Sequence, residues 1–374
     1  MIQNRAVRQI LVAGFVMTLW VPLIALLVGP PRSVSESEKR ELARFPDGAV
    51  ATRSLRAYTQ ALEEFYDDHF GFRETLIRWY NHVQVRWLGI TNSQWVVVGG
   101  SGWLFQGGEP HLRDMRNTWS FAPGELAHWA RVLVEKQEWL SARGIEYLFV
   151  IAPNKHTIYP QHLPASVNRV RPVSRTDQLI AHLRAHTQVP VLDLREPVRE
   201  AAARMRTHHK TDTHWNAFGA YIGYQTVMTA VAERLPGVRM LQLGIDDFRT
   251  RETPGGDLAQ ALNMRDAFRE AAVETLQPVR DCAVDVTLDP SADDRQRNQQ
   301  AFATECSKSG HRLLMFRDSY ALAMMPYLAE SFGYAYYVPA SPVPLATLRE
   351  LVADHHPDIV IEQRASRWLR TPEG

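Results

Sequence analysis

From residue 123 onward the chain alternates short, continuously apolar runs with longer helical ones, and this pattern restricts the possible folds more than any other feature. Strands that are apolar on both sides must be buried on both faces, as in a parallel sheet covered by helices. The sequence therefore predicts an α/β domain, a three-layer sandwich around a parallel sheet, over residues 123–374. The expected strands are Ile145–Ile151, Val189–Leu194, Arg312–Phe316, Tyr334–Val338 and Asp358–Ile361.

Helix-length segments separate these strands. Gly144 follows the first of them and is a typical C-terminal stop signal. The region from about residue 250 to about 310 is polar and lacks the alternation, so we interpret it as an irregular insertion made of loops. The expected helices are Pro123–Arg143, Thr176–His186, Asn216–Leu235, Tyr320–Ser331 and Val343–Asp354.

The N-terminus carries an apolar run, Ile10–Val28, without a single charged residue. About 20 apolar residues suffice to cross the hydrocarbon core of a membrane as a helix. Arg5 and Arg8 precede the run, which places the N-terminus in the cytoplasm by the positive-inside rule. We expect residues 1–32 to form a cytoplasmic N-terminus and a single-pass anchor, with the rest of the chain exported.

A cleaved signal peptide is the alternative reading of this run. Signal peptides usually have apolar regions of roughly 7–15 residues that end at a small-x-small site. The run here is longer and continues into Gly29–Arg32 without such a site, which favours an uncleaved anchor.

Residues 33–122 are expected to be a linker and smaller elements that pack on the core. Pro30–Pro46 is polar and flanked by prolines, as linkers often are. Leu55–Leu88 has helical spacing interrupted at His69–Gly71, which predicts two helices. Trp95–Phe105 contains two strand-like runs around a Gly-Gly-Ser-Gly turn.

Charge and cysteine content exclude several classes of partner. The formal net charge is +1 and no basic block occurs, so we expect no nucleic-acid partner. The two cysteines, Cys282 and Cys306, do not have zinc-site spacing. In an oxidising compartment they could form one disulfide, and the alternative is two unpaired thiols.

Ser319 is the first candidate for chemistry, because it follows a predicted strand and opens a predicted helix. Ligands of open parallel sheets gather beyond the carboxyl ends of the strands. Free N–H groups at a helix start suit a developing oxyanion. Arg317 and Tyr320 flank this position and are candidates for contacting the oxyanion or the substrate. The alternative is an ordinary helix cap, since Asp and Ser are favoured there.

A serine nucleophile needs a base, and His214 with Asp212 two residues earlier could supply it. The alternative is a capping cluster at a helix start in which His214 is hydrogen-bonded locally. After another strand, Asn154 could donate to an oxyanion and Lys155 could contact an anionic sugar, although Pro and Asn are also common in plain turns. A metal site is a weaker reading, because the spacing lacks a helical i, i+4 pair. That reading would use His208, His209, Asp212 and His214.

Taken in order, several segments resemble the alginate O-acetyltransferase family, exported SGNH-hydrolase-like proteins that acetylate exopolysaccharides. The resemblance covers most of the chain after the apolar run. Arg317 stands where ordinary SGNH hydrolases have Gly, and only Thr213 separates Asp212 from His214. The segments are Glu41–Pro46, Phe65–Arg73, Gly102–Phe105, Ala152–Pro160, Asp212–Asn216, Gly256–Ala259 and Arg317–Tyr320.

The resemblance implies that Ser319 is the nucleophile, His214 its base and Asp212 the orienting acid, in a circularly permuted SGNH fold. It implies acetyl transfer to exopolysaccharide hydroxyls in the periplasm by a protein of the bacterial inner membrane. It also implies a multi-pass membrane O-acyltransferase as acetyl source and other exopolysaccharide biosynthesis proteins as partners. No cofactor is expected. An esterase or deacetylase with the same triad, and a non-catalytic polysaccharide-binding component, are the alternatives.

Overall fold

The computed structural model describes residues 5–29, 33–35, 40–48, 52, 54–277, 279, 281–287 and 293–372. The predicted chain start at residues 1–4, residues 30–32 and 36–39 of the predicted linker, and residues 278, 280 and 288–292 of the predicted insertion lie outside this description. The chain forms two compact units. One comprises Met1–Ser93 and Ala259–Arg265, and the other comprises Gln94–Leu258 and Asp266–Gly374.

The larger unit is built around a seven-stranded sheet with the order β6-β5-β13-β11-β12-β10-β9. All pairings from β6 to β12 are parallel, as the sequence predicted. These strands overlap the five predicted ones. Their bounds are β5 Glu146–Ala152, β6 Val191–Asp193, β11 Arg312–Phe316, β12 Tyr334–Val338 and β13 Ile359–Ala365.

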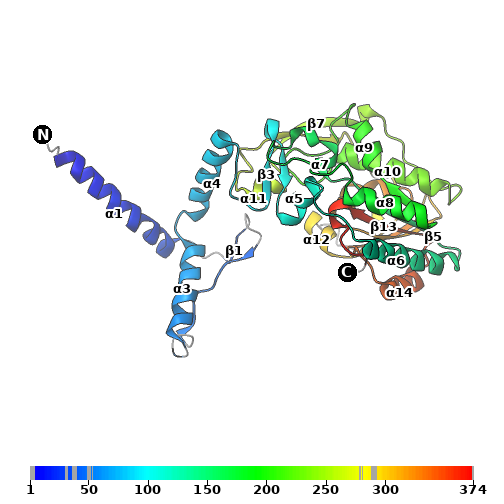
Figure 1. Ribbon diagram of the computed structural model, residues 1–374, viewed down its shortest axis with the longest axis horizontal. Coiled ribbons are helices and arrows are strands. Elements are labelled where there is room, and N and C mark those ends of the chain that lie inside the picture. The colour runs from blue at the N-terminus through cyan, green and yellow to red at the C-terminus, as the bar shows by residue number, and fades with distance from the viewer. Residues whose placement is uncertain are drawn as a thin grey trace. The chain divides into compact units, whose positions relative to one another are not determined.

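Two apolar clusters, one on each face of the sheet, make the larger unit a three-layer sandwich. Alternate residues of β5 belong to different clusters: Leu148 and Val150 to one, Phe149 and Ile151 to the other. Helices of both layers are visible in Figure 1. One layer contains α6 (Pro123–Ser141), α8 (Arg175–His186) and α14 (Leu345–His355), and the other α9 (Arg195–Ala201), α10 (Ala217–Ala232) and α13 (Met325–Ala329).

The prediction of an irregular insertion was wrong, because the region contains regular strands. Two of them extend the sheet with antiparallel pairings, so the sheet is mixed at this edge. Strand β7 escaped prediction because it is mostly exposed; Arg249 and Arg251 pair across the ladder with Glu274 of β8. The elements are β7 (Phe248–Thr253), α11 (Asp257–Ala261), β8 (Glu270–Thr275), β9 (Val284–Asp285), α12 (Asp294–Gln299) and β10 (Phe302–Glu305).

Two further boundaries differ from prediction. The helix expected over residues 320–331 is a 3-10 turn, η5 (Ser319–Ala323), followed by the short α13, whose first turn holds Pro326. The last strand runs four residues further than predicted and buries Glu362. Lys136 donates to this carboxylate at 2.8 Å and Tyr147 at 3.0 Å, which makes the buried charge tolerable.

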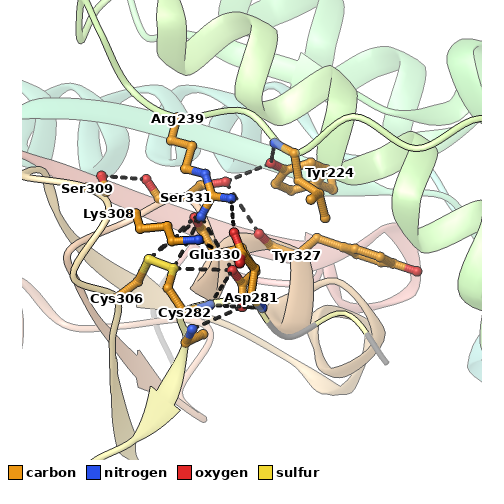
Figure 2. Close-up of polar contacts among 12 residues, drawn as sticks. Tyr224, Arg239, Asp281, Cys282, Cys306, Lys308, Ser309, Tyr327, Glu330 and Ser331 are labelled. Atoms are coloured by element: carbon orange, nitrogen blue, oxygen red, sulfur yellow. Dashed lines mark hydrogen bonds and ion pairs between the residues drawn. A yellow bond between two sulfur atoms is a disulfide. The ribbon is translucent and has the colours of Figure 1, made fainter. Parts of the chain in front are cut away.

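A disulfide joins Cys282 and Cys306. Figure 2 shows the polar cluster around it. The buried Glu330 carboxylate accepts hydrogen bonds from the main-chain N–H groups of Asp281, Cys282 and Ala283 at 2.9 to 3.1 Å. These contacts hold the segment before β9 against the end of α13.

The smaller unit contains the apolar helix α1 (Arg5–Val28). Its segment Val7–Val28 is long and apolar enough to cross a membrane. The two predicted helices of residues 55–88 are present, with the break where it was expected. They are α3 (Leu55–His69) and α4 (Arg73–Val83), the latter continued by the π-helical turn η1 (Gln84–Leu88), beside the short strands β1 (Val34–Ser35) and β2 (Arg40–Glu41).

The remaining elements belong to the larger unit. The two strand-like runs of Trp95–Phe105 form the predicted antiparallel pair around the glycine-rich turn. These elements are β3 (Val96–Val98), η2 (Gly100–Gly102), β4 (Leu104–Gln106), α5 (Glu109–Met115), α7 (Lys155–Ile158), η3 (Pro160–His162), η4 (Ile245–Asp247) and η6 (Ser366–Trp368).

Opening the disulfide should destabilise the fold. We expect Cys282→Ser/Cys306→Ser to lower the free energy of unfolding by about 2–4 kcal/mol, since the bond closes a loop between residues 24 apart. Thermal unfolding of the full chain in detergent, with and without a thiol reductant, measures this effect. Reductant should lower the Tm of the wild type and leave that of the double variant unchanged. Equal Tm values for the two proteins under oxidising conditions would contradict the prediction.

Candidate active site

The predicted site residues Asn154 and Ser319 lie at the carboxyl ends of β5 and β11, with only β13 between these strands. Asp318 fastens the Ser319 turn to the end of β13. Its carboxylate accepts from Ala365 N at 2.5 Å and caps η5 through Tyr320 N at 2.9 Å. Asp318 therefore links the turn that presents Ser319 both to β13 and to the start of η5, which favours a fixed position of the Ser319 hydroxyl.

The structure brings Asp212, His214 and Ser319 together. His214 Nε2 lies 2.8 Å from Ser319 Oγ, and His214 Nδ1 lies 2.8 Å from Asp212 Oδ1. The pair Asp212–His214 precedes the serine by more than 100 positions along the chain, which is the permuted order expected. A histidine held in this way can accept the serine proton while the carboxylate fixes its tautomer.

Asp212 is held as a carboxylate by its donors. Burial would raise its pKa, but the hydrogen bond and charge of His214 and the N–H of Asp257 outweigh burial and keep the pKa well below its usual range. Oδ1 also accepts from His214 N at 3.0 Å, and Oδ2 accepts from Asp257 N at 3.0 Å. The charge of Asp212 is thus available to stabilise a protonated His214.

Three residues to which the sequence analysis gave no role also support the loop that carries Asp212 and His214. Asp257 accepts from Thr213 N at 2.8 Å and from Thr213 Oγ1 at 2.7 Å. Glu270, which is buried, accepts from Lys210 N at 2.7 Å. A Cβ on Gly256 would lie 2.4 Å from Asp212 Cβ, so only glycine permits this approach. The Gly-Asp pair was noticed as part of the family-like segment, whereas nothing in the sequence around Glu270 marks it.

Lys155 does not contact a substrate as the sequence suggested. Its buried ammonium donates to the carbonyl oxygens of His209, Lys210 and Asp212 at 3.1, 3.0 and 2.6 Å. Burial lowers the pKa of Lys155 to about 8, although the negative charges of Asp212 and Asp257 act in the opposite direction. All three protons of the ammonium are engaged, so Lys155 positions the loop that carries Asp212.

Arg317 is also occupied elsewhere. Its buried guanidinium donates to the main-chain carbonyls of Arg297, Asn298 and Gln300 at the end of α12. The expectation that it contacts the oxyanion or substrate was therefore wrong, because its hydrogen bonds fasten α12 to the strand end. Arg317 stands at the position where ordinary SGNH hydrolases have glycine, and its long side chain is what reaches α12.

Tyr320 lies beside His214 but its hydroxyl points into the protein. The ring centroids are 5.2 Å apart, and the hydroxyl donates to Thr213 O at 2.8 Å. Burial raises the pKa of Tyr320, so the phenol stays protonated. Trp215 Nε1 donates to Tyr320 O at 2.8 Å. Tyr320 thus packs the histidine loop against the serine turn.

Two groups remain as candidate oxyanion donors. The main-chain N–H of Ser319 has no hydrogen-bond partner within the described part of the chain. The Asn154 side-chain amide is the second candidate, because its Nδ2 could donate; its buried Oδ1, an acceptor, is unpartnered among the described residues. Asn154 itself is buried, and its main-chain N–H donates to Ser366 Oγ at 3.2 Å at the end of β13. Asn154 and Ser319 follow strands two places apart in the sheet, and such strands are separated by roughly 10 Å.

The suggested metal ligands are arranged differently from the sequence-based cluster. Asp212 and His214 lie with Asp257, rather than with His208 and His209, within 4.8 Å of one another. Both ring nitrogens of His214 and both oxygens of Asp257 already take part in the hydrogen bonds above. Those bonds account for the positions of these side chains.

The fold and this site define an SGNH-hydrolase-like domain. Residues 96–305, more than half of the chain, match the family described as "SGNH hydrolase-like domain, acetyltransferase AlgX". The chain belongs to this family, as the resemblance of its ordered segments predicted.

Sequence identity to individual relatives is low. The chain is 27% identical over 150 residues to a probable alginate O-acetylase AlgJ of Pseudomonas aeruginosa, covering 38% of this chain and 36% of the relative. A protein of the same name from Azotobacter vinelandii is 27% identical over 141 residues, covering 36% and 34%. The match thus spans about a third of each relative. Bacillus cereus PatB1 shares the fold, with a TM-score of 0.52, 15% identity, and coverage of 73% of this chain and 95% of PatB1.

Replacing Gly256, which lies against Asp212, should slow the chemical modification of Ser319. We expect Gly256→Ala to reduce the rate at which a sulfonyl fluoride modifies Ser319 by about 100-fold, because the methyl group displaces Asp212 and a misplacement of about 1 Å costs this much. Gly124→Ala is the matched control, since a Cβ there meets nothing within 4 Å. Equal modification rates in both variants would contradict the role given to this contact. Mass spectrometry of the Ser319 peptide measures the rate.

Proposed function

We propose that this chain is an O-acetyltransferase that moves acetyl groups onto hydroxyls of an exopolysaccharide through an acyl-serine. The observation that carries the proposal is the position of His214, 2.8 Å from both Ser319 Oγ and Asp212 Oδ1, in a chain of an acetyltransferase family. Named relatives are probable alginate O-acetylases, which supports an exopolysaccharide as acceptor.

In the first half-reaction, Ser319 Oγ attacks the carbonyl carbon of an acetyl ester. His214 Nε2 takes the serine proton, and the carboxylate of Asp212 stabilises the resulting imidazolium. The Ser319 N–H and the Asn154 amide are the proposed donors to the oxyanion. His214 then returns the proton to the departing alcohol as the tetrahedral intermediate collapses, which leaves acetyl-Ser319.

The second half-reaction runs the same steps toward the acceptor. A sugar hydroxyl gives its proton to His214 Nε2 and attacks the acetyl carbonyl. Collapse releases the acetylated sugar, and the proton passes from His214 to Ser319 Oγ. In each half-reaction His214 takes up one proton and gives one up, so atoms and charges balance over the two half-reactions.

We further propose that α1 anchors the chain in the bacterial inner membrane and that the larger unit acts in the periplasm. The apolar segment Val7–Val28 supports an anchor, and the Cys282–Cys306 disulfide fits an oxidising compartment. A multi-pass membrane O-acyltransferase is the proposed source of acetyl groups on this side, and other exopolysaccharide biosynthesis proteins are proposed partners.

An acetyl-transfer assay separates this function from its alternatives. Full-length protein is given an activated acetyl ester with and without a polysaccharide acceptor, and acetylated sugar is measured by mass spectrometry. Ser319→Ala should reduce transfer by at least about 1000-fold, and Asp212→Asn by a comparable factor. Transfer that survives Ser319→Ala would exclude the acyl-serine.

The acceptor dependence distinguishes transferase from esterase. A transferase should form acetylated sugar at the expense of free acetate as acceptor is added. Release of acetate at a rate that no acceptor changes would instead identify an esterase. Protein that binds polysaccharide but neither transfers nor hydrolyses would identify a non-catalytic component.

A further inference from the structure

Helix α4 with its continuation η1 leaves a row of large apolar side chains in solvent. They recur with helical spacing, so at roughly 100° per residue they fall on one side of the helix. Their exposed fractions range from 42% for Val83 to 81% for Trp87. This apolar stripe consists of Leu76, Trp79, Tyr80, Val83 and Trp87.

The opposite side of α4 is already engaged within the smaller unit. Asn81 donates to Leu262 O at 2.8 Å, and Asn263 donates to the Glu74 carboxylate at 2.6 Å. Val85 is buried. These contacts fix the rotation of the helix about its own axis. The described residues of this unit thus contact the polar side of the helix and leave the apolar stripe open.

The start of α4 lies against the apolar helix α1. An ideal Cβ on Gly71, just before α4, would be 2.2 Å from Pro22 O and 2.7 Å from Ala25 Cβ. Pro22 precedes the last residue of the apolar segment, Val28, by six positions, which is about 9 Å at the rise of an α-helix. In Figure 1, α4 runs across the direction of α1 and not alongside it.

We propose that the apolar stripe lies in the outer interface of the same bilayer that α1 spans, an inference that rests on the membrane anchor proposed above. Interfacial helices sit with their apolar side about 5–10 Å into the boundary of headgroups and acyl chains. Gly71 lies against Pro22 of α1, about 9 Å from the end of the apolar segment, which is a similar depth. Trp and Tyr are the side chains that prefer this level, because their rings are apolar and their N–H and O–H groups are polar.

Charge on the flank of the stripe suits the same partner. Arg86 is exposed and directly precedes Trp87 of the stripe along the chain. Its guanidinium can reach phosphate oxygens while the stem stays against apolar surface. The stripe would hold the smaller unit against the membrane and limit the distance that residues beyond 93 can move away from it.

Lipid-borne quenchers test this placement in the full chain. The native cysteines are joined in the disulfide, so a single added cysteine can carry a bimane fluorophore. Trp79→Cys and Trp87→Cys place the label on the stripe, and Arg78→Cys places it on an exposed position on the far side of the same helix. Val16→Cys reports on α1. Each protein is reconstituted in nanodiscs of anionic phospholipid with spin-labelled acyl chains, and aqueous iodide is the second quencher.

The proposal predicts that lipid quenching at positions 79 and 87 exceeds that at position 78 by at least threefold, with the reverse order for iodide. Lipid quenching at position 16 alone would overturn the stripe's placement and leave the anchor intact. No lipid quenching at any position would overturn the anchor together with the stripe. Protection of positions 79 and 87 from both quenchers would show that protein covers the stripe and would equally overturn the proposal.

Discussion

The Asp212 carboxylate is the group on which the rest of the site depends. Three N–H donors meet its two oxygens, at 2.8 to 3.0 Å, and one of them is the His214 ring. Burial alone would favour the protonated acid, but hydrogen bonds to a charged group contribute roughly 1.5–3 kcal/mol each and offset that cost. Since the carboxylate keeps its charge, His214 is held with Nε2 directed at Ser319.

The sheet supplies the second constraint, because it brings distant segments to one edge. The end of β13 makes hydrogen bonds to both neighbouring segments. Ala365 N donates to the Asp318 carboxylate in the serine turn, and Ser366 Oγ accepts from the main-chain N–H of Asn154. The Asp–His loop is fixed separately, by the Lys155 ammonium beneath it and the glycine contact beside it. Residues around Asp212, His214 and Ser319 thus determine where these three side chains lie.

The central strands and helices could be predicted because burial on both faces leaves a readable apolar pattern. The same reasoning failed for β7, whose side chains are mostly exposed and therefore leave no apolar pattern, and for the helix after β11, which Pro326 divides. Ser319, His214 and Asp212 could be named from strand ends and spacing, and from the family resemblance. The occupation of Lys155 and Arg317 could not, because their partners are main-chain carbonyls that carry no signal in the sequence.

Trapping the acetyl group on the chain tests the central claim most directly. Full-length protein is exposed to an acetyl ester without acceptor, digested, and mapped by mass spectrometry before and after polysaccharide is added. The hydrogen-bonded arrangement of Asp212, His214 and Ser319 predicts one acetyl group on Ser319 that is lost to the sugar, and none in His214→Ala. Acetylated sugar formed without any acetyl on Ser319, or equal labelling of Ser319 in His214→Ala, would contradict the account.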